Sequence, residues 1–446
     1  MQTNRPQSDL MSQDSPGQHA VDSRPVGAHG VLALVAPSLQ RLVLTAVCLS
    51  YLAFGVLFQL FPPLLSALGS QFRVNHSTAS LVMTLFLLPI LVVAFPAGAL
   101  VARYGVRRIG VWAFALELSG ALVSSAAPTF AVLLLGRAVS GLGGGLLVIA
   151  LLSLIIECIP QEKRGLALGI FVAGLPAGTG IAFDVLAPLG TKLGWRAEMG
   201  VAFLLLLGVL LVFLRAVPRT PHRCVSAPRL LPVLRTGQLW RLALVTLLGY
   251  TAIIGFTTWA PTTLVTFARV PLWLGTVLAS ILLVVDIPFA PLWGAVSDRL
   301  GRRKPFIVGG FTIYLLGSLV VPVVAHAGGW GIAGLLITIT GMGVGCAMFF
   351  PAALAIPAET VEPEQVGLAY ALFFMAQVGG MLLGPVLIGA VLDFGSATGA
   401  FLAVSAITLA GVLVGLTLRG RKPGKGQVRN RTGEWDFSGA RGGESR

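Results

Sequence analysis

Apolar residues recur along this chain in long runs, separated by short polar segments rich in Gly, Pro, Arg and Lys. A helix needs about 20 apolar residues to cross the roughly 30 Å hydrocarbon core of a bilayer. Twelve runs reach about that length, namely 42–66, 78–101, 109–127, 130–156, 165–189, 198–216, 240–265, 272–297, 305–326, 330–356, 366–391 and 397–418. The pattern therefore predicts an all-α membrane protein with twelve transmembrane helices.

The polar segments divide the chain into five parts. Six runs precede a Pro- and Arg-rich segment, and six follow it. We therefore expect a first six-helix bundle at 41–217, a central loop at 218–239 and a second six-helix bundle at 240–419. The polar tails at 1–40 and 420–446 lack the apolar residues that a packed core requires, so we expect them to be disordered.

Composition and charge placement agree with a membrane protein. Only 11% of the residues are charged and 56% are hydrophobic, against roughly 25% charged residues in soluble domains. With an even number of spans both tails share one side, which holds 26 of the 31 Lys and Arg residues; four lie on the other side and Arg137 lies inside a span. The positive-inside rule then places both tails and the central loop in the cytoplasm, with the spans in the cytoplasmic membrane. This asymmetry accounts for the net charge of +14 without a nucleic-acid partner.

Two loop motifs recur at nearly constant offsets. The segment Gly98–Arg108 follows the second span, and the similar segment Gly294–Lys304 follows the eighth span 196 residues later. Likewise Glu157–Ala167 follows the fourth span, and Glu359–Ala369 follows the tenth 202 residues later. The two halves are therefore predicted to be parallel repeats.

These loops resemble the G-x-L-x-D-R-x-G-R-R/K signature of the major facilitator superfamily. The second copy is intact, whereas the first has Ala102 where the family has Asp. Gly136–Gly143 resembles the R-x-x-x-G-x-G pattern of the family's fourth span, and Gly194-Trp195-Arg196 also fits. More locally, Phe58–Pro63 and Ala167–Gly180 look like the branch that contains cyanate permeases and nitroimidazole-resistance proteins.

The resemblance covers residues 41–419 and implies two pseudo-symmetric bundles with a substrate site between them at mid-membrane. It implies a secondary active transporter that works by alternating access as a monomer, without a metal or other cofactor. We expect coupling to protons and a small organic or inorganic anion as substrate; a proton-driven exporter of drugs or metabolites is the alternative. An enzyme or a channel is a poorer fit, because the chain has no HExxH, GxSxG or Walker motif.

Four ionisable side chains lie within the predicted spans, where each costs roughly 2.5–3.5 kcal/mol. Arg137 and Asp184 fall at similar depth in neighbouring spans, and we expect a buried pair. Arg137 would face the cavity and either bind an anionic substrate or exchange Asp184 during proton coupling; a static ion pair is the structural alternative. Asp286 is expected to be a proton-coupling group or a neutral hydrogen-bonded acid. Glu117 is expected to be structural or to snorkel.

Charged residues near the repeated loops predict a conformational latch, made of Arg103, Arg107, Glu157, Asp298, Arg299, Arg303 and Glu359. Within each half the Glu is expected to pair with an Arg of the loop motif, that is Glu157 with Arg103 or Arg107, and Glu359 with Arg299 or Arg303. Asp298 is expected to face the positive N-terminal end of the fifth span. Solvated charges that contribute little individually are the alternative.

Polar and aromatic side chains in the first, seventh and eleventh spans complete the candidate substrate site. With Arg137, we expect the site to be lined by Tyr51, Gln59, Tyr250, Phe374 and Gln377. Packing is the alternative role for each of them. The two Gln residues are the better candidates, because a side-chain amide in lipid needs a hydrogen-bond partner.

Overall fold

The structure, a computed structural model, describes residues 37–159, 161–217, 235–325, 331–361 and 365–418. The C-terminal tail and most of the N-terminal tail and central loop defined from the sequence lie outside the described residues. All regular structure in the described part of the chain is helical. The structure thus confirms that the apolar runs form helices.

The first bundle contains α1 (Pro37–Gln59), η1 (Pro62–Leu64), α2 (Leu65–Phe72), α3 (His76–Ala79), α4 (Leu81–Tyr104), α5 (Val106–Ser125), α6 (Phe130–Cys158), α7 (Gln161–Gly180), η2 (Ile181–Leu186), α8 (Ala187–Leu193) and α9 (Trp195–Ala216). The second contains α11 (Gly237–Phe267), α12 (Leu272–Val284), α13 (Asp286–Leu300), α14 (Lys304–Ala325), α15 (Gly331–Thr360), α16 (Val366–Asp393) and α17 (Ala397–Leu416). Four spans of the described residues are interrupted: α1–η1–α2, α3–α4, α7–η2–α8 and α12–α13.

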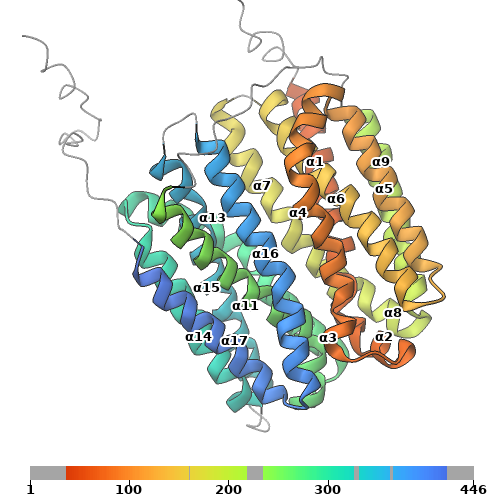
Figure 1. The fold of residues 1–446 in the computed structure, drawn as a ribbon, viewed down its shortest axis with the longest axis vertical. Coiled ribbons are helices and arrows are strands. Elements are labelled where there is room, and N and C mark those ends of the chain that lie inside the picture. The colour runs from red at the N-terminus through yellow and green to blue at the C-terminus, as the bar shows by residue number, and fades with distance from the viewer. Residues whose placement is uncertain (1–36, 160, 218–234, 326–330, 362–364, 419–446) are drawn as a thin grey trace, which may run out of the picture.

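Eleven helical segments of the described residues are long and apolar enough to cross a membrane. The remaining span is α5, whose 20 residues include Arg107, Arg108 and Glu117. It packs along α6 and α9 like a full span. Twelve spans in two bundles are therefore present, as the sequence predicts (Figure 1).

Both bundles use the same helix pairing. In the first, α1 packs against α7 and α9, and α6 packs against α4 and α5; in the second, α11 packs against α16 and α17, and α15 packs against α13 and α14. Equivalent glycines permit one of these contacts. A Cβ at Gly178 would collide with the α1 backbone at Leu52, and one at Gly384 would collide with the α11 backbone at Thr251. The absent side chains let these helices touch.

The two ends of the molecule differ in charge. We call the end at which α1 begins and α17 finishes the basic end; it lies uppermost in Figure 1 and carries the two repeated loops. The opposite end, where α2, α3 and α8 lie, is the distal end.

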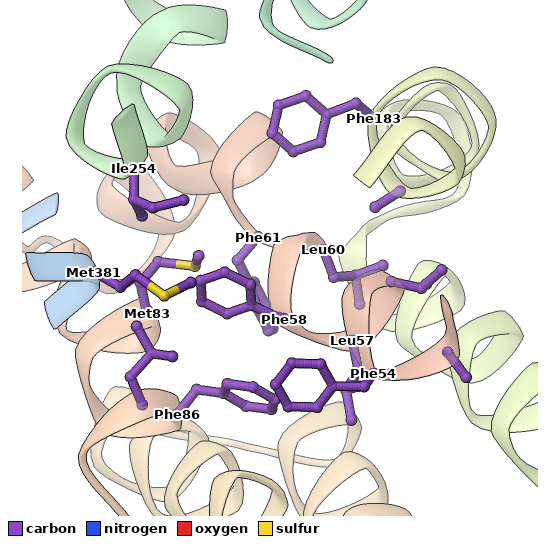
Figure 2. Close-up of a cluster of buried hydrophobic side chains, with 14 of the residues drawn as sticks. Phe54, Leu57, Phe58, Leu60, Phe61, Met83, Phe86, Phe183, Ile254 and Met381 are labelled. Carbon is purple, nitrogen blue, oxygen red and sulfur yellow. The ribbon is translucent and has the colours of Figure 1, made fainter. Parts of the chain in front are cut away.

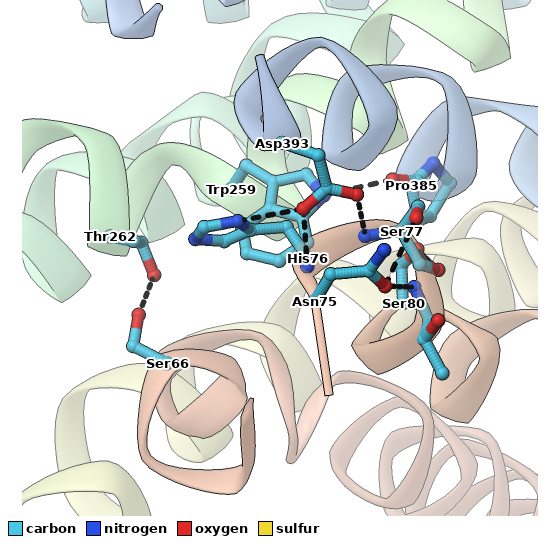
Figure 3. A network of polar contacts seen from close by, with 10 residues as sticks. Ser66, Asn75, His76, Ser77, Ser80, Trp259, Thr262, Pro385 and Asp393 are labelled. Atoms are coloured by element: carbon cyan, nitrogen blue, oxygen red, sulfur yellow. Dashed lines mark hydrogen bonds and ion pairs between the residues drawn. The ribbon is translucent and has the colours of Figure 1, made fainter. Parts of the chain in front are cut away.

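The bundles are hydrogen-bonded to each other at the distal end (Figure 3). Asp393, the last residue of α16, accepts hydrogen bonds from the first two backbone N–H groups of α3, His76 at 2.7 Å and Ser77 at 3.0 Å. The imidazole Nδ1 of His76 lies 3.0 Å from the same carboxylate. Negative charge is favourable at a helix N-terminus. Here the helix, α3, belongs to the first bundle and the carboxylate of Asp393 belongs to the second.

Two further side-chain contacts adjoin this one. Ser66 of α2 and Thr262 of α11 share a hydrogen bond of 2.8 Å between their hydroxyls. The rings of Trp259 and His76 contact each other edge to face, with their centroids 5.2 Å apart. The indole N–H of Trp259 donates to the carbonyl of Pro385 at 2.8 Å. The distal end is therefore a closed part of the interface between the bundles.

We expect the pair Ser66→Cys and Thr262→Cys, in a chain whose native cysteines are replaced, to form a disulfide in most molecules after mild oxidation. The two hydroxyls are already in contact, and a disulfide requires Cβ atoms about 4 Å apart. The yield is measured by mass spectrometry after proteolysis.

The matched control pairs Ser70→Cys with Thr262→Cys, because Ser70 lies one turn further along α2 and bonds to the carbonyl of Ala67 in its own helix. Its yield should be at least about fivefold lower. Equal yields from the two pairs would show that the distal end does not rest in this closed arrangement.

Candidate functional site

Arg137, in α6, is completely buried within the first bundle. Its guanidinium donates to three backbone carbonyls: Leu57 at 2.7 Å, Val82 at 3.0 Å and Phe58 at 3.2 Å. The carbonyl of Phe58 has no donor four residues ahead, because Pro62 lacks an N–H. Arg137 thus supplies donors that the end of α1 lacks.

Aromatic rings cover the same guanidinium. It lies 4.2 Å from the ring centroid of Phe86 and 5.0 Å from that of Phe61, two residues of the buried cluster in Figure 2. Ring faces attract cations, and the carbonyls at the end of α1 are the negative pole of that helix. The positive charge is compensated without a carboxylate.

The expected ion pair between Arg137 and Asp184 is wrong. No ion pair joins these two described residues, and Asp184 instead contacts the second bundle. Depth along a span, which suggested the pair, does not fix the direction in which a side chain points. The expected exposure of Arg137 to a cavity is also not met in this state, since the side chain is sealed.

Asp184 lies on η2, a π-helical turn within the fifth span. Pro188 follows four residues later and cannot donate to the carbonyl of Asp184, which disfavours an ordinary α-helical turn there. The hydroxyl of Ser280, in α12, lies 2.9 and 3.1 Å from the two carboxylate oxygens of Asp184. Such turns are frequent at functional sites, and this one joins the bundles within the membrane.

Asp286 marks the interruption of the eighth span. Pro288 cannot donate to the carbonyl of Val284, and α12 ends at that residue. Asp286 begins α13, half-buried, and its Oδ1 has no hydrogen-bond partner among the described residues.

A set of side chains that we call the central cluster lies around Tyr250 and includes this carboxyl: Tyr51, Tyr250, Asp286, Cys346 and Gln377. Tyr250 interacts with the side chains of the other four. Tyr51 comes from the first bundle and the rest from the second. The structure therefore brings together four of the residues that the sequence singled out, and adds Cys346.

The surroundings of the central cluster are aromatic. The ring of Tyr51 stacks on Phe171 and Phe54, with ring centroids 4.0 and 5.5 Å apart. The ring of Phe374 in α16 lies instead against Tyr370 and Phe373, and 41% of its surface is exposed. Gln59 is completely buried, and neither end of its amide has a partner among the described residues. Gln59 is therefore sealed like Arg137.

Glu117 does not snorkel. It is completely buried in α5, and neither carboxylate oxygen has a hydrogen-bond partner among the residues that the structure describes. Its side chain lies against α6 at Gly143 and Gly144, where an added Cβ would collide with it. Its burial favours a neutral acid that packs within the first bundle.

At the basic end of the second bundle, Arg303 binds two acids. It donates to Glu359 at 2.8 Å and contacts Asp298 at 2.5 Å. Burial lowers the pKa of Arg303, but the hydrogen bonds to these carboxylates outweigh burial and raise it. The expected Glu359–Arg303 pair is therefore present, whereas Asp298 pairs within its own bundle and is largely exposed.

In the described part of the first repeat, the two arginines bind other groups. Arg107 donates to the carbonyls of Leu214 and Val217 at the end of α9, and Arg103 lies over the ring of Tyr104. The expected pairing of Glu157 with either arginine is not formed. Arg107 thus binds backbone carbonyls, which no sequence pattern reveals, in place of the carboxylate of Glu157 that was expected to accept from it.

We expect Arg137→Lys to lower the stability of the first bundle by roughly 2–4 kcal/mol, because a lysine ammonium cannot reach three carbonyls and each orphaned buried acceptor costs about 1–3 kcal/mol. Thermal unfolding in detergent measures the change. Arg196→Lys is the matched control, since Arg196 donates to one carbonyl, that of Ala127. An unfolding temperature unchanged by Arg137→Lys would contradict the structural role.

Known proteins share this architecture. The D-xylose-proton symporter structure superimposes with a TM-score of 0.71 at 15% identity, covering 85% of this chain and 97% of that one. A bacterial homologue of the human lysosomal transporter Spinster, solved in an inward-facing and unoccupied conformation, gives a TM-score of 0.68 at 14% identity, covering 86% and 96%.

Sequence relatives agree. The uncharacterized MFS-type transporter YtbD of Bacillus subtilis is 24% identical over 78% of this chain and 88% of its own length. The nitrite extrusion protein of the same species is 25% identical over 65% and 77%. A probable sugar efflux transporter of Haemophilus influenzae is 24% identical over 40% of this chain and 45% of its own length. Because the sequence model of the Major Facilitator Superfamily also matches residues 44–285 and 273–440, the chain belongs to that superfamily of transporters.

Proposed function

We propose that this transporter is a proton-coupled exporter of a small neutral or cationic solute rich in hydrogen-bond donors. In this proposal it lies in the cytoplasmic membrane with its basic end in the cytoplasm, as the positive-inside rule favours. The central cluster binds the solute, and Asp286 and Asp184 carry protons.

The observation that carries the proposal is a surplus of acceptors in the central cluster. Asp286 Oδ1 and Gln377 Oε1 have no hydrogen-bond partner among the described residues. An unpaired buried acceptor is costly, so the cluster favours a ligand that donates hydrogen bonds or carries positive charge. The aromatic rings near Tyr51 suit either a sugar ring or an organic cation.

A proton and a solute would compete at Asp286. An ionised carboxylate is costly in a low-dielectric site unless a donor or a cation accompanies it. The site would therefore hold either a proton or a solute, and exchanging one for the other produces antiport.

Asp184 would link the proton to the change of access. Its hydrogen bond with Ser280 joins the bundles, so separation of α12 from η2 breaks the bond and leaves the carboxylate to take a proton. Re-forming the hydrogen bond between Ser280 and Asp184 would favour the state in which the distal end is closed.

Export is the direction that the relatives' names favour, since these include sugar efflux and nitrite extrusion. A solute would enter the site from the basic end, because contacts close the distal end. The anion expected from the sequence loses its main support, since the guanidinium of Arg137 is sealed.

The proposed conformational latch would form in the opposite state, in which the basic end is closed. Here Asp298 contacts Arg303 of its own bundle. When the basic end closes, Asp298 would transfer to the N-terminal end of the fifth span, while Arg299, Arg303 and Glu359 hold the loop.

We expect Asp286→Asn to lower proton-driven transport at least about tenfold while solute exchange without a gradient persists. An amide still forms hydrogen bonds but cannot release a proton. Proteoliposomes with an imposed pH gradient provide the measurement, with xylose, ethidium and nitrite as neutral, cationic and anionic probes.

Glu198→Gln is the control, because Glu198 is a buried acid of α9 outside the central cluster, and it should leave coupling unchanged. Full gradient-driven transport by Asp286→Asn would contradict proton coupling at this residue. Transport of nitrite alone would contradict the proposed substrate class.

A further inference from the structure

A groove of about 420 Å³, lined by none of the central-cluster residues, opens at the basic end of the second bundle. Leu300, at the end of α13, and Arg302, Pro305 and Phe306, around the start of α14, form its walls, and Met348 of α15 completes it. Leu300 is 61% exposed, although it is a large apolar side chain at a membrane-spanning helix end. The groove is thus apolar apart from one cation.

Arg302 differs from its basic neighbours. Arg303 is bound by Glu359 and Asp298, and Lys304 donates to the carbonyl of Leu416. Arg302 is exposed and has no hydrogen bond or ion pair with any described residue. Its guanidinium is left to bind an anion at the mouth of an apolar groove.

We propose that this groove binds an anionic phospholipid from the leaflet at the basic end, with the phosphate on Arg302 and an acyl chain along Phe306 and Met348. The groove lies where a membrane-spanning helix meets the headgroup region. Guanidinium binds phosphate with directed hydrogen bonds, and cytoplasmic leaflets carry the anionic lipids that attract basic residues. A free phosphate would gain nothing from the apolar walls.

A lipid bound there would contact α13, α14 and α15 together. The adjoining loop carries Asp298 and Arg303, so lipid occupancy would fix the loop whose ion pairs must rearrange during transport. This inference rests on the proposed orientation of the chain, with its basic end in the cytoplasm, and not on the proposed substrate or coupling.

Native mass spectrometry of the full chain in detergent tests the inference, with phosphatidylglycerol and phosphatidylcholine of identical acyl chains as probes. We expect phosphatidylglycerol to bind the unmodified chain about tenfold more tightly, and Arg302→Gln to abolish that preference. Arg299→Gln is the matched control, because Arg299 is also exposed and lies outside the groove; it should retain the preference.

A second variant, Met348→Trp, fills the groove while keeping Arg302, and should weaken phosphatidylglycerol binding about fivefold. Thermal unfolding verifies that each variant is folded. Equal loss from Arg299→Gln and Arg302→Gln would mean that general surface charge attracts the lipid, and would overturn the site. Complete displacement of phosphatidylglycerol by millimolar inorganic phosphate would overturn it as well, by showing that the apolar walls contribute nothing.

Discussion

Every backbone polar group in a bilayer needs a partner within the protein, because hydrocarbon offers none. In three interrupted spans of this chain a proline, which has no backbone N–H, leaves the carbonyl four residues earlier without its usual donor. These prolines are Pro62, Pro188 and Pro288. Each interruption is accompanied by an ionisable side chain, respectively Arg137, Asp184 and Asp286. Arg137 repairs the first break, whereas the two acids face the other bundle or the central cluster. The candidates for proton transfer therefore lie where the helices cannot remain regular.

Much of the fold follows from the sequence because membrane spans obey a length rule and the repeats fix the pairing. The second loop motif restricted the partner of Glu359 to Arg299 or Arg303, and the structure has Arg303. The sequence named Tyr51, Tyr250 and Gln377 as candidate substrate-site residues and Asp286 as a candidate proton carrier, and the structure brings these four residues together. What united them was the rule that polar groups in lipid seek one another or a cavity.

The rest could not be read from residue types, because backbone carbonyls compete with acids for cations. Arg137 and Arg107 both bind carbonyls left free at helix ends instead of the expected carboxylates. The distal contact of His76 with Asp393 was missed for a related reason, since a lone His far from any motif gives no sign that another bundle's helix end will meet it.

The polar side-chain contacts described between the two bundles are hydrogen bonds rather than an extensive set of ion pairs. A typical hydrogen bond contributes only about 0.5–1.5 kcal/mol net, so the bonds made by Ser66, Asp393 and Asp184 amount to a few kcal/mol together. A free-energy difference of a few kcal/mol between two conformations leaves the less stable one populated. In the proposed mechanism, a proton on Asp184 would remove the charge that favours its bond from Ser280, and a solute at Asp286 would contact both bundles through Tyr51 and Tyr250. Each ligand can thus shift the same small balance, which is the physical requirement for coupling their movements.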